Sequence, residues 1–153
     1  MSSFYLVAAT RDQAPTVSQD FSEDRWPTLC IDPFSTALTT LVGHLTDRST
    51  KDIRSTFEDL TPVPDGAEDA EPWDESFWVA GVERLPSDYV AAIAGITDEH
   101  VPEVVRWWLT VDDFEHYRQS DWCSETGLKE LLTDIRNFLR AAGDTPVLLY
   151  SSP

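Results

Sequence analysis

Two short clusters place histidine beside carboxylates, the side chains that bind metal ions and transfer protons. They consist of Asp98, Glu99 and His100, and of Asp112, Asp113, Glu115 and His116. A helical metal site such as His-Glu-x-x-His holds its ligands on one face, and neither cluster has that spacing. In a chain with 28 acidic residues, an acid beside a histidine is also expected by chance. We therefore expect no metal site. A carboxylate- and histidine-based hydrolase or metal-dependent enzyme is the catalytic alternative.

Other patterns that carry chemistry are missing from the sequence. No Gly-x-Ser-x-Gly elbow presents a nucleophile, and the six glycines form no phosphate-binding loop. His44 falls between apolar positions of a predicted helix, which is typical of a boundary histidine with a hydrogen-bonded ring. Cys123, next to Trp122, has the character of a small buried residue. We predict no catalytic residue and no cofactor.

Net charge is the strongest compositional feature. The 153 residues include 28 Asp and Glu against 11 Lys and Arg, a formal net charge of -17. This surplus repels nucleic acid and anionic membranes and favours a basic protein partner. The opposing interpretation is a salt-adapted or compositionally biased chain whose charge serves hydration alone.

Aromatic residues suggest where a partner would be anchored. Trp107 and Trp108 are consecutive and must point in different directions on a helix, so one of them can be exposed. Exposed aromatics surrounded by acids are suitable anchors for a basic surface. The candidate partner-binding residues are Glu68, Asp69, Glu71, Trp73, Asp74, Glu75, Asp112, Asp113 and Glu115.

Apolar runs near both ends predict the strands that hold the chain together. Residues 4–9 and 146–150 are short, apolar and rich in β-branched or aromatic side chains, and we expect them to pair in one sheet. Residues 28–31 are expected to form a short strand or an extended lead-in to the next helix, and residues 77–82 a strand, with a helix as the alternative. The fold class is therefore α+β, with several helices packed on a small sheet in a single domain over residues 1–153.

Helical periodicity predicts the remaining elements. Asp32 and Pro33 open a helix that reaches Leu45, and further helices follow Pro86, Thr97 and Ser124, the last ending at Gly143. A shorter helix is expected around Ile53 to Leu60, while residues 11–15 have the composition of a turn. Residues 61–72 form an acidic, proline-rich stretch that we expect to be a surface loop.

The predicted cellular location, the cytoplasm, depends on features that the sequence lacks. Residues 1–10 have no basic segment of a signal peptide, and no stretch reaches the roughly 18 apolar residues of a membrane span. Cys30 and Cys123 are far apart, and two reduced thiols in the cytoplasm are expected.

These observations favour a non-catalytic acidic protein that engages a basic partner and inhibits or regulates it, as an immunity protein neutralises its toxin. A nucleic-acid mimic that inhibits DNA-binding proteins is the nearest alternative. A mimic of this kind presents carboxylates in rows, and on the last helix such a row would be interrupted by Lys129, Arg136 and Arg140.

Overall fold

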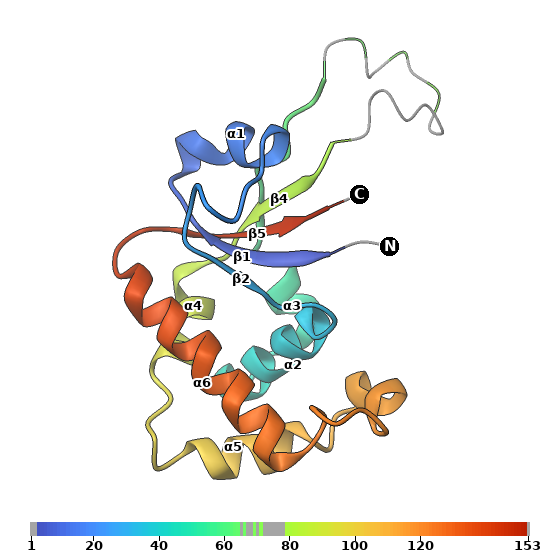
Figure 1. The fold of residues 1–153 in the computed structure, drawn as a ribbon, viewed down its shortest axis with the longest axis vertical. Helices are drawn as coiled ribbons and strands as arrows, with labels where there is room; N and C mark the ends of the chain where they lie inside the picture. The colour runs from blue at the N-terminus through green and yellow to red at the C-terminus, as the bar shows by residue number, and fades with distance from the viewer. Residues whose placement is uncertain (1–2, 65, 67–68, 70, 72–78, 153) are drawn as a thin grey trace. The chain divides into compact units, whose positions relative to one another are not determined.

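The strands of the described residues form one antiparallel sheet of five strands (Figure 1). The computed structural model describes residues 3–64, 66, 69, 71 and 79–152. The strand order is β2-β1-β5-β4-β3. The strands are β1 (Phe4–Ala8), β2 (Thr28–Cys30), β3 (Glu58–Asp59), β4 (Gly81–Arg84) and β5 (Val147–Ser151).

The two ends of the chain are joined in this sheet. β1 and β5 pair antiparallel from Phe4 opposite Ser151 to Ala8 opposite Val147. Beyond the strands, the Ser152 amide donates to the Ser3 carbonyl at 2.9 Å. The predicted pairing of the terminal strands and the α+β fold class are confirmed.

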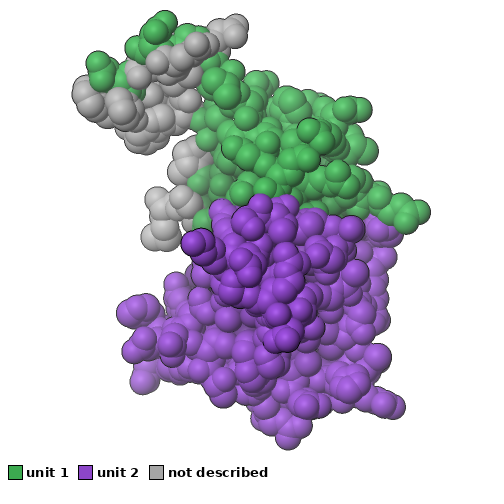
Figure 2. All heavy atoms as spheres, turned by 180° about the vertical axis from the view of Figure 1, so that it is seen from behind, with its two compact units in different colours: residues 1–32, 57–85, 144–153 green, residues 33–56, 86–143 purple. Residues whose placement is uncertain are grey.

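The chain forms two compact units, coloured separately in Figure 2. The sheet unit comprises residues 1–32, 57–85 and 144–153, and the helical unit comprises residues 33–56 and 86–143. Because the chain passes between the units four times, neither is one continuous stretch of sequence. The expectation of a single domain over 1–153 stays a prediction.

The sheet unit has its own apolar core. It is lined by Val7 and Ala9 of the β1 segment, Val82, Leu148 and Tyr150, together with Ala14, Val17 and Trp26. Ala14 and Val17 belong to α1 (Ala14–Gln19), which follows the 3₁₀ helix η1 (Arg11–Gln13) and packs on β4 and β5. The buried Ser18 hydroxyl donates to the Ala80 carbonyl at 2.7 Å.

The helical unit is built from longer elements. They are α2 (Ser35–Thr46), α3 (Thr50–Arg54), α4 (Ser87–Ala94), α5 (Val101–Trp108), the 3₁₀ helix η4 (Asp112–Tyr117) and α6 (Glu125–Ala142). α6 packs against α4 and α5, and α2 packs against α3 and α4. The predicted helices after Pro86, Thr97 and Ser124 are confirmed.

Several local predictions are wrong or displaced. Residues 11–15 are helical, because Pro15 lies in the first turn of α1, where its missing amide hydrogen is not needed. The N-cap of α2 is Phe34, with no side-chain cap, so Asp32 does not cap it. The predicted helix around Ile53 to Leu60 ends at Arg54, and β3 follows.

The remaining strand prediction falls partly outside the described residues. The prediction placed this strand at 77–82, whereas β4 begins at Gly81 and ends at Arg84. Residues 77 and 78 are not described.

Both cysteines are free. Within the described part of the chain, no helix combines the length and the apolar composition needed to cross a membrane.

Candidate functional site

The two consecutive tryptophans of α5 have different environments. Val101, Val105 and Trp108 share the buried face of this helix, as their spacing of four and three residues requires. The Trp108 indole is fully buried and its Nε1–H donates to the Ala37 carbonyl at 2.9 Å. Trp107, one position earlier, is only half-buried.

Trp107 forms a stacked pair with His44 of α2. Their ring centroids are 3.6 Å apart and the ring planes differ by 9°. The imidazole was expected to be a hydrogen-bonded boundary ring, but this face-to-face contact with the indole is its main feature. Stacking of this kind fixes the orientation of both rings without burying them completely.

A groove of about 550 Å³ opens beside this pair. α2 contributes His44 and Leu45, and α4 and the turn after it contribute Ala92, Gly95 and Ile96. His100, the N-cap residue of α5, and Glu103, Val104 and Trp107 within α5 complete the lining. The volume lies within the range of binding pockets, and mostly apolar walls with a few polar groups are typical of them. Two of the three histidines of the chain line this groove.

The polar groups of the groove lie near solvent. The His100 Nδ1 is 3.9 Å from a Glu103 carboxylate oxygen, with both side chains more than half exposed at 67% and 82%. At that separation and exposure the pair contributes little stability. The Glu103 carboxylate therefore remains able to pair with another cation.

A second hollow of about 350 Å³ shares His44 and Trp107 with the groove. Its other lining residues are Thr40, Gly43, Asp47, Arg48 and Ser49. Arg48 pairs with Asp88 at the start of α4, at 2.9 Å. The stacked rings thus lie on the walls of the groove and of this second hollow.

η4 carries three of the predicted partner-binding residues. Asp112 and Glu115 are exposed, and their spacing of three places them on one side of a 3₁₀ helix. Asp113 is half-buried and its Oδ2 accepts from the Thr40 hydroxyl of α2 at 2.9 Å. Asp113 thus helps to join η4 to α2, and its carboxylate is partly engaged.

The other predicted partner-binding residues belong to the sheet unit. Asp69 and Glu71 are exposed. Glu68, Trp73, Asp74 and Glu75 lie outside the described residues. Since η4 is in the helical unit, the structure places the two predicted sets in different units.

Metal binding was the alternative for the histidine clusters. Among the described residues, no group of three or more His, Cys, Asp and Glu side chains is arranged to hold a metal ion. The carboxylate that approaches His100, at 3.9 Å, is that of Glu103, three residues later on α5.

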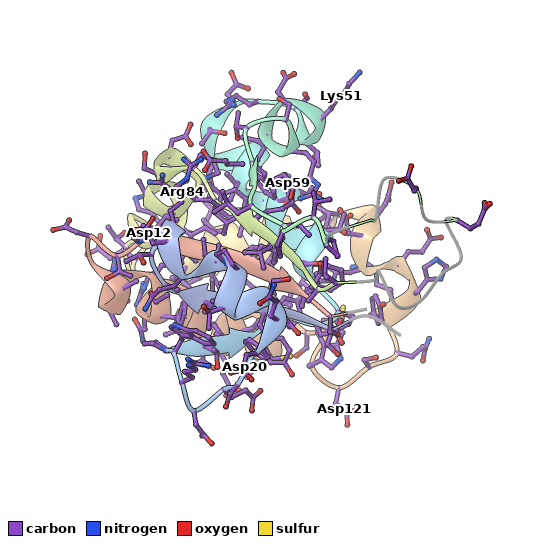
Figure 3. The ribbon with its side chains drawn as sticks, turned by 90° about the horizontal axis from the view of Figure 1, so that it is seen from above. Asp12, Asp20, Lys51, Asp59, Arg84 and Asp121 are labelled. Carbon is purple, nitrogen blue, oxygen red and sulfur yellow. The ribbon has the colours of Figure 1, made fainter. Side chains whose placement is uncertain are left out.

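Acidic charge is distributed unevenly between the units. The sequence segments of the sheet unit include 15 acids and 3 bases, a formal charge of -12, whereas those of the helical unit have 13 acids and 8 bases, a charge of -5. Four of the 15 acids lie outside the described residues, and the 11 that are described still leave a charge of -8. Two of the three bases of the sheet unit are already paired, Arg11 with Glu58 and Arg25 with Asp20. Figure 3 labels three of its exposed acids, Asp12, Asp20 and Asp59.

One carboxylate of the sheet unit has a perturbed titration. The Asp59 carboxylate accepts from the Thr61 amide at 3.0 Å, and this hydrogen bond lowers the pKa of Asp59. Asp59 therefore stays ionised further into acid than an ordinary surface aspartate.

The fold and site define an α+β protein with a five-stranded antiparallel sheet, a strongly acidic sheet unit and an aromatic-walled groove in its helical unit. No family model matches the chain, and comparison with curated proteins and with solved structures gives no significant match.

Proposed function

We propose that this protein is a non-catalytic acidic binding protein that engages a basic partner protein and inhibits or regulates it, as an immunity protein does with its toxin. The observation that carries the proposal is the charge of the sheet unit, -12 from 15 acids and 3 bases. A charge that served hydration alone would have no reason to favour one unit so strongly.

Electrostatic attraction would mainly raise the rate at which the two proteins associate. Opposite fields raise association rates by up to several orders of magnitude at low salt, and rim charges affect the association rate more than the final affinity. Asp24, Asp69 and Glu71 are exposed, so an approaching partner can reach their carboxylates. Few cations of the sheet unit compete for them, because Arg11 and Arg25 have their own carboxylate partners.

The test begins with finding the partner. The immobilised protein is exposed to lysate of its source cells at about 50 mM and about 500 mM NaCl, a range over which screening removes most surface attraction. Proteins retained only at low salt are identified, purified and measured for binding one at a time. We expect a single basic protein whose activity falls when the complex forms.

Matched neutralisations then test the sheet unit itself. One variant carries Asp24→Asn, Asp69→Asn and Glu71→Gln, and the control carries Glu99→Gln, Asp121→Asn and Glu130→Gln in the helical unit, with the same change in net charge. All six residues are exposed. We expect the first variant to slow association about tenfold and the control much less.

Two outcomes would overturn the proposal. One is a lysate that yields no basic partner at either salt concentration. The other is a partner whose association rate responds equally to both sets of neutralisations, since only total charge would then matter. Competition against a panel of unrelated DNA-binding proteins separates the specific inhibitor from a nucleic-acid mimic, which would displace DNA from many of them.

A further inference from the structure

The groove beside His44 and Trp107 has the chemistry of a pocket for one long cationic side chain. We infer that it receives an arginine of the basic partner, an inference that rests on the proposed function and names its anchoring site. The walls of the groove come from three helices of the helical unit, α2, α4 and α5. Because helices hold these walls, the pocket is present before the partner arrives.

The apolar walls fit the stem of an arginine. Leu45, Ala92, Ile96 and Val104 offer hydrocarbon surface to its three methylene groups, as apolar surfaces do for the stems of long charged side chains. The volume of about 550 Å³ exceeds that of a single side chain, so neighbouring residues of the partner also enter the groove. Burial of the stem supplies an attraction that salt does not screen.

The charged end of the arginine would meet two complementary features. The stacked His44 and Trp107 rings both line the groove, and a planar guanidinium stacks on aromatic rings where a lysine ammonium cannot. Glu103 supplies a carboxylate that is 82% exposed and can accept two parallel N–H bonds. None of the nine described residues that line the groove is a lysine or arginine that would repel the guest.

Charge around the groove points to the same occupant. Glu99 is exposed and immediately precedes His100, whereas Asp98 is already paired with Arg136 at 2.6 Å. The Glu103 carboxylate is therefore the charge of the groove that favours a cationic guest over an anionic one. An uncharged apolar segment would gain from the walls but would leave the Glu103 carboxylate without a partner.

Short peptides test this inference without knowledge of the partner. The probes are acetylated, amidated tripeptides with a central arginine, lysine, citrulline or leucine between two glycines. Binding is followed by NMR of the ¹⁵N-labelled protein, using the indole N–H signal of Trp107, which is the tryptophan signal lost in Trp107→Phe. We expect the arginine peptide to shift this signal saturably, with lysine and uncharged citrulline binding at least about threefold more weakly.

A matched pair of variants locates the charge contact. Glu103→Gln removes the carboxylate of the groove, whereas Glu99→Gln removes the same charge from an exposed residue that does not line it. We expect Glu103→Gln to weaken the arginine peptide at least about threefold and Glu99→Gln to have a much smaller effect. Equal effects of the two variants, or equal binding of arginine and citrulline, would overturn the inference, as would peptide shifts spread over the whole surface.

The partner complex gives a second readout that separates this inference from the proposed function. Trp107→Ala is expected to raise the dissociation rate of the complex at least about tenfold at both salt concentrations, because a buried anchor acts mainly on dissociation. If a basic partner binds with acid-dependent association but ignores Trp107→Ala, the arginine pocket is wrong and the proposed function stands. If the peptides bind and no basic partner exists, the proposed function is wrong and the pocket serves another cation.

Discussion

Arg136 of α6 is the one charged side chain that is buried among the described residues, with 5% of its surface exposed. Its guanidinium donates to the Ile96 carbonyl at 3.1 Å and pairs with Asp98 at 2.6 Å, while its Nε lacks a hydrogen-bond partner. Arg140, one turn later, also donates to the Ile96 carbonyl, at 3.0 Å. Both cations therefore donate to the Ile96 carbonyl, which lies just after the end of α4.

Replacing Arg136 separates its packing from its charge. Arg136→Ala leaves a cavity and should lower the free energy of unfolding by about 2 kcal/mol. Arg136→Met keeps the stem and removes the buried charge with its unpaired Nε, so it should cost less than about 1 kcal/mol. Urea unfolding of both variants measures which of the two loses more stability. A methionine variant as unstable as the alanine variant would mean that the charge contacts, rather than the stem, hold α4 and α6 together.

Tyr89 gives the protein a titration at alkaline pH. Its hydroxyl is 3.3 Å from that of Thr39 in the interior of the helical unit, and burial raises the pKa of Tyr89 above 10. Between about pH 10 and the higher folded pKa, the unfolded chain loses this proton while the folded chain keeps it. Stability is therefore retained below pH 10 and falls as the pH rises above it.

Tyr89→Phe should remove this part of the alkaline loss. The variant should be about 1 kcal/mol less stable near pH 8, because the contact with Thr39 is lost. Above pH 10 its stability should decline less steeply than that of the wild type, by up to about 1.4 kcal/mol per pH unit. Urea midpoints measured at pH 8 and pH 10.5 give both differences. Parallel curves for the two proteins would show that Tyr89 does not titrate differently on folding.

At the scale of elements, the start of α6 depends on a local cap and a close approach. The Ser124 hydroxyl accepts from the Gly127 amide at 3.0 Å, which satisfies one of the free amides of the first turn. Gly127 itself lies so close to the Trp122 carbonyl that a Cβ at this position would overlap the carbonyl oxygen. Loss of the serine therefore removes one hydrogen bond from this turn, whereas a side chain at position 127 would require the Trp122 carbonyl to move.

Ser124→Ala tests the cap. The change should lower the free energy of unfolding by about 1 kcal/mol, because the Gly127 amide loses its acceptor. Thr126→Ala, at an exposed position of the same turn, is the control and should be close to neutral. Thermal unfolding followed by circular dichroism measures both. Equal stabilities of the two variants would show that water replaces the serine hydroxyl without loss.

At the scale of the whole molecule, the net charge of -17 must oppose folding through repulsion among the acids. Added salt screens this repulsion, and the Debye length falls from about 30 Å at 0.01 M to about 3 Å at 1 M. The melting temperature should therefore rise with NaCl.

The neutralised variants described above refine this prediction. Neutralising Asp24, Asp69 and Glu71 should raise the melting temperature at low salt more than neutralising Glu99, Asp121 and Glu130, because the first three lie in the more acidic unit. Differential scanning calorimetry at about 0.01 M and 0.5 M NaCl measures the effect, which should vanish at the higher salt concentration. A melting temperature that does not depend on salt would mean that the acids are too far apart to repel one another.

The sequence alone determined the features that depend on neighbours within a turn or two. Periodicity and end signals located α4, α5 and α6, with Ser124 and Gly143 at the ends of the last helix, and short apolar runs located β1 and β5. The net charge also required no structure. Local prediction was wrong at α1 and at Ile53 to Leu60, where packing overrode weak local preferences.

Only the tertiary structure decided which distant side chains meet. The sequence indicated that Trp107 and Trp108 diverge, but nothing in it paired Trp107 with His44, 63 residues earlier, because that contact depends on how α2 and α5 are placed. The same is true of Asp113 with Thr40 and of Arg136 with Ile96. A helical period fixes the face on which a residue lies, whereas its partner across the helix interface is set by the packing of the complete unit.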